Sequence, residues 1–173
     1  MNDKVKKEVK DIIIEKKLDC SIEHFGDYIN WDASSLYEKY FSEDFIRTFK
    51  YKITWRFLLS SQKLSEKFII EIERYINFVS LSQYHSLSED FIRKFKDRVN
   101  WSYISINQKL SEGFIRDFQD KVDWREISQF QKMSPKFIKE FEEKIYFNKL
   151  SHNELLKIKD KNKPLERADL MDI

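Results

Sequence analysis

The chain has 173 residues, of which 41% are hydrophobic, 16% aromatic and 36% charged, and its formal net charge is +2. This balance is typical of a soluble globular chain rather than a disordered one, and the near-neutral charge gives no general argument for nucleic-acid binding. Only two glycines occur, which argues against a glycine-rich phosphate loop, a dinucleotide fingerprint and a β-sandwich with many tight turns.

The first segment, residues 1–16, is predicted to be an N-terminal capping helix. Val5, Val9 and Ile12 share one helical face, and lysines occupy the opposite face. Residues 17–40 follow as a degenerate repeat. The apolar positions that this segment shares with the copies downstream are Ile22, Phe25, Ile29 and Trp31.

Five copies of a 23-residue repeat are predicted over residues 41–154. Each copy begins with an apolar residue followed by serine, and successive copies start 23 residues apart. The starting pairs are Phe41-Ser42, Leu64-Ser65, Leu87-Ser88, Leu110-Ser111 and Met133-Ser134. Self-similarity at a fixed period of this length indicates a repeat array, in which each copy is one small structural unit.

Each copy is predicted to contain two helices, which we call helix A and helix B. The serine is a favourable N-cap for helix A, which the apolar spacing extends over about 12 residues. Helix B starts at a second cap residue that precedes an aromatic side chain, and these caps are Thr54, Asn77, Asn100 and Asp123. Helices this short are marginal alone, so stacking must stabilise them.

The predicted fold class is therefore all-α, an α-solenoid of tandem two-helix repeats with terminal capping helices. Residues 155–173 are expected to form a C-terminal capping segment and tail, because a charged stretch, KDKNKP, interrupts their apolar pattern. The charged ends argue against end-to-end stacking of copies, since they resemble caps.

The repeat LSEDFIRKFKDRVNW, residues 87–101, resembles tandem short helical repeats of uncharacterised proteins from large DNA viruses, bacteriophages and AT-rich bacteria. The resemblance covers most of the chain. It implies a helical-repeat architecture and says little about activity, because repeat folds host many functions.

An intracellular, cytoplasmic location is expected. Cys20 is the only cysteine and cannot form an internal disulfide. No apolar run approaches the length of a membrane span, and the N-terminus shows no signal-peptide pattern.

No catalytic residue, metal site or cofactor is predicted. The histidines, His24, His85 and His152, lie in distant repeats, and one cysteine provides neither metal-ligand spacing nor a Cys-His pair. His85 occupies the position that glutamine holds in other copies, so we interpret it as a variant of a polar column rather than a general base.

Two columns of basic residues recur with the repeat. The first consists of Arg47, Arg93, Arg116 and Lys139. Stacking would align it into a phosphate track, but acidic residues four positions away, such as Glu112 and Asp120 around Arg116, favour a salt-bridged face. The second column has no such regular acidic spacing and better supports nucleic-acid contact. Its members are Lys52, Arg98, Lys121 and Lys144.

Aromatic residues divide into two sets. The first follows the helical period and is predicted to be core: Phe45, Phe68, Phe91, Phe114 and Phe137, with Trp55, Trp101 and Trp124. The second lies on helix B beside the core positions: Phe57, Tyr84, Tyr103 and Phe130, with Arg56, Arg125 and Gln129 as polar companions. Exposed aromatic side chains are typical binding anchors, and packing between repeats is the alternative interpretation.

Polar residues also form columns. These are Ser82, Ser105, Ser128 and Ser151, and Gln62, Gln108 and Gln131. They either satisfy backbone groups between repeats or form a ligand-reading face. A code that reads one base per repeat needs variable residues, and these columns barely vary.

Together these features predict a non-enzymatic repeat protein that binds a protein partner, with no membrane and no small-molecule substrate. The resemblance extends this expectation to a phage- or virus-encoded inhibitor of a host defence complex that acts by steric occlusion. The alternative is a nucleic-acid-binding repeat protein that uses the basic columns.

Overall fold

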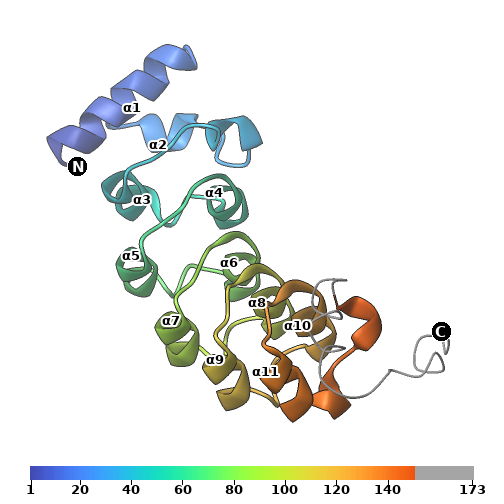
Figure 1. The fold of residues 1–173 in the computed structure, drawn as a ribbon. Coiled ribbons are helices and arrows are strands. Elements are labelled where there is room, and N and C mark those ends of the chain that lie inside the picture. Colours follow the sequence, from blue (N-terminus) through green and yellow to red (C-terminus); the bar gives the residue numbers. More distant parts are fainter. Residues whose placement is uncertain (151–173) are drawn as a thin grey trace. The chain divides into compact units, whose positions relative to one another are not determined.

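Helices and turns make up the whole described part of the protein, and no strand occurs in it. A computed structural model describes residues 1–150 (Figure 1). The chain divides into two compact units, Met1–His85 and a second unit that begins at Ser86. The predicted C-terminal segment, residues 155–173, lies outside the described residues, as do Ser151 and His152.

The first unit contains six α-helices and one short 3₁₀ helix within its described residues. In chain order these are α1 (Asp3–Glu15), α2 (Phe25–Tyr28), η1 (Ser34–Leu36), α3 (Glu43–Phe49), α4 (Trp55–Ser61), α5 (Glu66–Glu71) and α6 (Phe78–Tyr84). Helix α1 packs on α3, and α4 packs on α6, so equivalent helices of successive repeats are neighbours (Figure 1).

The described part of the second unit repeats this arrangement. Its elements are α7 (Glu89–Lys94), α8 (Trp101–Asn107), α9 (Glu112–Asp117), α10 (Trp124–Phe130), α11 (Pro135–Glu140), η2 (Glu142–Lys144) and η3 (Phe147–Lys149). Helix α10 packs on α8 and on η3. The prediction of an all-α array of tandem short helices at 23-residue spacing is confirmed.

Serine starts every helix A as predicted. The Oγ atom of each cap serine accepts a hydrogen bond from the backbone N–H three residues later, as between Ser111 and Phe114 at 3.1 Å. The same bond forms at Ser42, Ser65, Ser88 and Ser134. Because this bond satisfies an otherwise orphan donor, it fixes the start of each helix.

Helix A is shorter than predicted. It spans six or seven residues rather than about 12, and turns continue the chain beyond it. In several copies the indole N–H of the following tryptophan binds the turn after the helix. Trp101 donates to the carbonyl oxygen of Lys96 at 2.9 Å, and Trp124 donates to that of Gln119 at 2.8 Å. Helix α5 is equally short although Phe78 stands at this position, so the indole bond holds the turn but does not set the length of the helix.

Phenylalanine columns form the core of both units. The helix A phenylalanines predicted as core are all buried, with Phe45, Phe114 and Phe137 fully so. The tryptophans differ from the prediction, because Trp55, Trp101 and Trp124 are only half-buried. Trp101 and Trp124 pack one side on the next repeat's phenylalanine, whereas Trp55 stacks on Tyr75, and all three keep the indole N–H at a backbone carbonyl. An amphipathic ring suits this boundary position.

The degenerate repeat keeps two bonds of the regular copies. Trp31 donates its indole N–H to the carbonyl of Gly26 at 2.9 Å, like the later tryptophans. The Tyr37 hydroxyl then donates to the carbonyl of Trp31 and accepts from the backbone N–H of Thr54. In the second unit the hydroxyl of Ser105 bridges Trp101 and Asp123 in the same way. In the degenerate repeat the hydroxyl of Tyr37 thus makes the two bonds that the hydroxyl of Ser105 makes in the second unit.

Candidate partner-binding surface

The helix B aromatics occupy two positions one helical turn apart. Phe57 and Tyr103 are the third residues of α4 and α8, whereas Tyr84 and Phe130 are the last residues of α6 and α10. Each unit therefore holds one aromatic side chain of each kind. We call these four residues the helix B aromatics.

Exposure separates the two positions. Tyr84 is 37% and Phe130 is 49% exposed, whereas Phe57 and Tyr103 are half-buried. Phe57 packs against Tyr37, with ring centroids 5.8 Å apart. The predicted polar companions, Arg56, Arg125 and Gln129, are all exposed. Tyr84 and Phe130 are therefore the more exposed members of the set.

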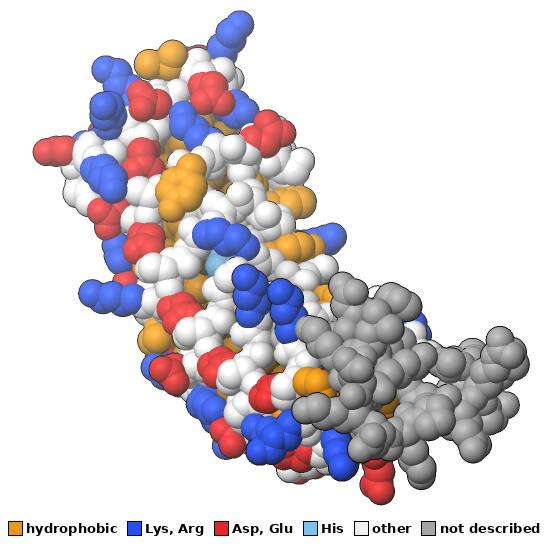
Figure 2. Space-filling view, viewed as in Figure 1, with side chains coloured by type: hydrophobic (Ala, Val, Ile, Leu, Met, Phe, Trp, Pro, Cys, Tyr) orange, Lys and Arg blue, Asp and Glu red, His pale blue; other side chains and the backbone are white. Residues whose placement is uncertain are grey.

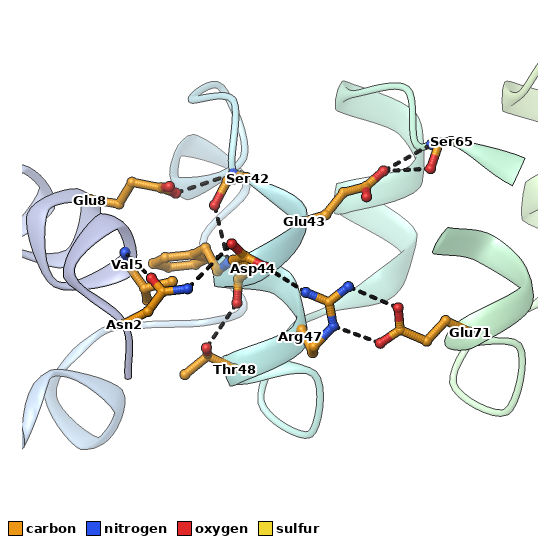
Figure 3. A network of polar contacts seen from close by, with 11 residues as sticks. Asn2, Val5, Glu8, Ser42, Glu43, Asp44, Arg47, Thr48, Ser65 and Glu71 are labelled. Atoms are coloured by element: carbon orange, nitrogen blue, oxygen red, sulfur yellow. Dashed lines mark hydrogen bonds and ion pairs between the residues drawn. The ribbon is translucent and has the colours of Figure 1, made fainter. Parts of the chain in front are cut away.

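The first basic column is tied into the array by carboxylates. Arg47 makes two hydrogen bonds to Glu71, at 2.6 and 2.8 Å, and a third to Asp44 (Figure 3). Arg116 binds Glu140 through two bonds at 2.7 and 2.8 Å. The hydrogen bond from Arg47 is the main cause that lowers the pKa of Glu71. Such two-point pairs hold the guanidinium in a fixed position.

The partners of this column differ from those that the spacing suggested. Each arginine binds an acidic residue 24 positions later, and Arg93 accordingly pairs with Asp117 at 2.7 Å. Of the pairs expected four positions away, Arg116 with Glu112 forms at 3.9 Å as a secondary contact. Each guanidinium also lies over a core phenylalanine of the next repeat, as Arg93 does over Phe114 at 4.9 Å. Lys139 lies exposed on α11.

Lysines of the second basic column are also ion-paired, although the sequence spacing shows no regular acidic partner for them. Lys121 binds Asp97 at 3.1 Å, and Lys144 lies 3.8 Å from Asp120. These pairs again join positions 24 residues apart. In the first unit Lys52 binds Asp27 at 2.5 Å. The remaining member, Arg98, lies over the ring of Phe95.

Charged side chains of both signs are intermixed on the surface. Figure 2 shows acidic and basic side chains interspersed over the described elements of one face. Six cations of the two basic columns contribute to this pattern, because each forms an ion pair with a carboxylate: Arg47, Arg93, Arg116, Lys52, Lys121 and Lys144. The array of described residues thus lacks a continuous basic track along either column.

The glutamine column is buried and binds the backbone of the preceding repeat. Gln62 accepts from the N–H of Phe41 at 2.8 Å and donates to its carbonyl at 2.9 Å. Gln131 accepts from the N–H of Leu110 and donates to the carbonyls of Gln108 and Ser105. Inter-repeat satisfaction of backbone groups, one of the two interpretations left open by the sequence, therefore describes this column.

His85 replaces glutamine in this column. Its Nε2 atom accepts from the backbone N–H of Leu64 at 3.2 Å, and the side chain is buried. Burial, and secondly the positive charge of Lys63, lower the pKa of His85 to about 4. The ring is therefore neutral near pH 7, as an acceptor must be. The interpretation of His85 as a column variant is confirmed.

Sequence reasoning missed an aromatic cluster in the turns after α3 and α5. The hydroxyl of Tyr75 donates to that of Tyr51 at 3.1 Å, and the two rings meet edge to face. Tyr75 also stacks on Trp55. Tyr51 is 79% exposed. The repeat offered a sign of this cluster. The positions 23 and 46 residues after Tyr51 and Tyr75 all hold charged residues, so two aromatic residues there break the pattern of the repeat.

Two open hollows lie between turns of successive repeats. One, of about 250 Å³, is lined by Glu23, Gly26, Asp27, Thr48, Phe49, Tyr51 and Lys52. The other, of about 450 Å³, is lined by Gln119, Asp120, Val122, Trp124, Glu143, Lys144, Ile145 and Tyr146. An ion pair of the second basic column borders each hollow, Lys52 with Asp27 in one and Lys144 with Asp120 in the other.

Comparisons with protein-family models, with curated proteins and with solved structures found no match. Within residues 1–150 no group of three or more His, Cys, Asp or Glu side chains is placed to hold a metal ion. None of the described helices has the length and apolar character needed to cross a membrane.

Proposed function

We propose that the protein is a non-enzymatic helical-repeat module that binds a protein partner through the helix B aromatics, with Arg56, Arg125 and Gln129 as polar companions. One observation carries the proposal. Tyr84 and Phe130 keep 37% and 49% of their surface exposed at equivalent positions of two repeats. Tyrosine and phenylalanine provide large contact areas with few rotatable bonds, which is why such residues anchor protein interfaces.

The ion pairs favour a protein over a nucleic acid as the partner. Nucleic-acid affinity comes mainly from cations that neutralise phosphates. In this protein Arg47, Arg93 and Arg116 already bind carboxylates of the next repeat, and a phosphate would have to displace them. The nucleic-acid alternative is therefore kept as an outcome of the experiments below.

The resemblance to repeats of phage and viral proteins extends the proposal. A small repeat module encoded by such a genome would act in the host cytoplasm and occlude a surface of a host defence complex. No cofactor or substrate is required for this mechanism. The protein would compete with the partner's normal ligand for one surface of the partner. The degree of inhibition would therefore follow the fraction of partner that is bound.

Affinity capture with a variant tests the proposal. Tagged wild-type protein and the Tyr84→Ala/Tyr103→Ala/Phe130→Ala variant are incubated with lysate of the native host cell, and captured proteins are quantified by mass spectrometry. We expect a stoichiometric partner on the wild type and a loss of at least about tenfold on the variant, since anchor residues carry most of the binding energy.

A matched control keeps the test specific. Tyr40→Ala removes a tyrosine that is 70% exposed and lies just before helix α3 rather than on a helix B. This control should capture the partner as the wild type does, and both variants should keep the wild-type helical circular dichroism. Full capture by the triple variant would overturn the proposed surface.

A further inference from the structure

A cluster of aromatic and basic side chains lies in the turns after α3 and α5, and we call it the tyrosine cluster. It consists of Tyr51, Tyr75, Trp55, Lys50 and Arg74. The ring centroids of Tyr51 and Tyr75 are 5.3 Å apart, and Trp55 stacks on Tyr75 with centroids 6.3 Å apart. The Lys50 ammonium lies 5.3 Å and 5.4 Å from the two tyrosine centroids.

The same two positions hold ion pairs in other repeats. Asp97 with Lys121, and Asp120 with Lys144, occupy the places of Tyr51 with Tyr75, and all three pairs are 24 residues apart. An ion pair is therefore sufficient for the packing of these turns. The tyrosines add exposed aromatic surface that the array does not need, since Tyr51 is 79% exposed.

Exposed aromatic surface extends one repeat toward the N-terminus. Tyr28 occupies the position of Tyr51 in the degenerate repeat and is 62% exposed. The hollow of about 250 Å³ beside Tyr51 lies between the turns of these two repeats. At this repeat position the first unit thus has Tyr28, Tyr51 and Arg74, and the second unit has Asp97, Asp120 and Glu143.

The cations of the tyrosine cluster form no salt bridge among the described residues, although the charge of Lys50 contributes to lowering the pKa of Glu71. Among the described residues neither Lys50 nor Arg74 forms an ion pair, whereas Arg47 and Lys52 nearby are both paired. Lys50 is held over two tyrosine rings, which places its charge at a defined point of the surface. Two positive charges beside an apolar surface are complementary to a segment that carries carboxylates and an apolar side chain.

We propose that the tyrosine cluster is a docking surface for an acidic peptide segment of a protein partner, with Lys50 and Arg74 binding its carboxylates and Tyr51 contacting an apolar side chain. This inference rests on the proposed function and adds a second surface to it. The tyrosine hydroxyls supply donors and acceptors for a peptide backbone.

A peptide fits this surface better than a nucleic acid does. Stacking of bases needs open ring faces. Here Trp55 stacks on Tyr75, and Lys50 lies over both tyrosine rings.

Peptide selection tests the inference. A phage-displayed library of random peptides of about 12 residues is panned on the full-length protein, and selected peptides are measured by fluorescence polarisation. The test variant is Tyr51→Asp/Tyr75→Lys, which installs the ion pair found at two other junctions. The Tyr75→Lys substitution has a precedent in another repeat. At the equivalent position Lys144 lies over Trp124 at 5.5 Å.

We expect net-acidic peptides to be enriched and to bind the test variant at least about tenfold more weakly, with an unchanged melting temperature. The control Asp97→Asn/Lys121→Gln removes the equivalent pair in the second unit and should keep wild-type affinity. Substituting glutamine for glutamate in a selected peptide should weaken it by a similar factor, because the carboxylates meet Lys50 and Arg74.

Several results would overturn the inference. These are no enrichment, enrichment of peptides without acidic residues, or equal binding to the test variant. A labelled single-stranded oligonucleotide of about 20 nucleotides that binds the wild type and is lost on the variant would assign the cluster to nucleic acid. Self-association in sedimentation that the variant abolishes would assign it to a second copy.

The lysate capture described above separates the two proposals. A partner that is captured equally by the wild type and by Tyr51→Asp/Tyr75→Lys leaves the proposed function standing and, with failed peptide selection, removes this inference. Failure to capture any partner removes the proposed function itself.

Discussion

At the residue scale, single side chains connect neighbouring repeats through the backbone. Gln62 binds both backbone groups of Phe41, and Glu43 accepts from the N–H and the hydroxyl of Ser65 (Figure 3). A buried backbone group without a partner is costly, so these bonds fix the register of stacking. Such residues are uniform because the backbone groups that they bind recur in every copy.

His85 makes one of these connections dependent on pH. Its pKa is about 4 in the folded protein and about 6.5 in an unfolded chain. At pH values between these two pKa values, His85 therefore binds a proton in the unfolded state but not in the folded state. Stability is fully retained above pH about 6.5 and falls as the pH decreases toward 4.

We predict that His85→Gln flattens this dependence. When the pH is lowered from 7 to 5, protonation of His85 in the unfolded state should lower the free energy of unfolding of the wild type by about 2 kcal/mol. The variant should not show this loss. Denaturant unfolding at both pH values measures the difference. His24→Gln, at an exposed site, is the control and should keep the wild-type profile; the same profile for His85→Gln would refute the assignment.

At the element scale, every helix A ends after six or seven residues, while the apolar pattern of the sequence continues beyond it. The sequence period correctly predicted which side chains are buried after α7, since Phe95 and Val99 are both in the core. It could not show where helical hydrogen bonding stops, because apolar side chains in the turn after the helix are buried as well. Apolar spacing reports burial and does not report the last helical hydrogen bond.

Substitutions of two neighbouring glutamines, one in α10 and one directly after it, should change stability by different amounts. Gln131 follows α10, is buried and makes three bonds to backbone groups of the preceding repeat. Gln131→Leu leaves these groups without partners, so we expect a loss of at least about 2 kcal/mol in unfolding free energy. Gln129→Leu makes the same chemical change at an exposed site of α10 and should alter stability by less than about 0.5 kcal/mol.

Thermal and denaturant unfolding of both variants measures the contrast. Equal stability of Gln131→Leu and the wild type would mean that the column does not hold the repeats together. The polar ladder would then have to be explained by a ligand rather than by packing.

At the scale of the whole molecule, ion pairs between repeats determine which surfaces remain for a partner. The sequence showed the basic columns but not their neutralisation, since the partners are 24 residues away and come together only when repeats stack. The candidate surface on helix B could be predicted because its aromatics stand outside the core period. The tyrosine cluster was missed, because Tyr51 and Tyr75 are 24 residues apart, at different positions of the repeat, and meet only when repeats stack.

The most direct test of the central claim, that the partner is a protein, is nuclease treatment during affinity capture. Tagged full-length protein is used to capture its ligands from native host lysate, with and without nuclease, and proteins are identified by mass spectrometry. The account predicts a stoichiometric protein partner that survives nuclease. Recovery of nucleic acid, together with loss of every protein partner after nuclease treatment, would contradict it.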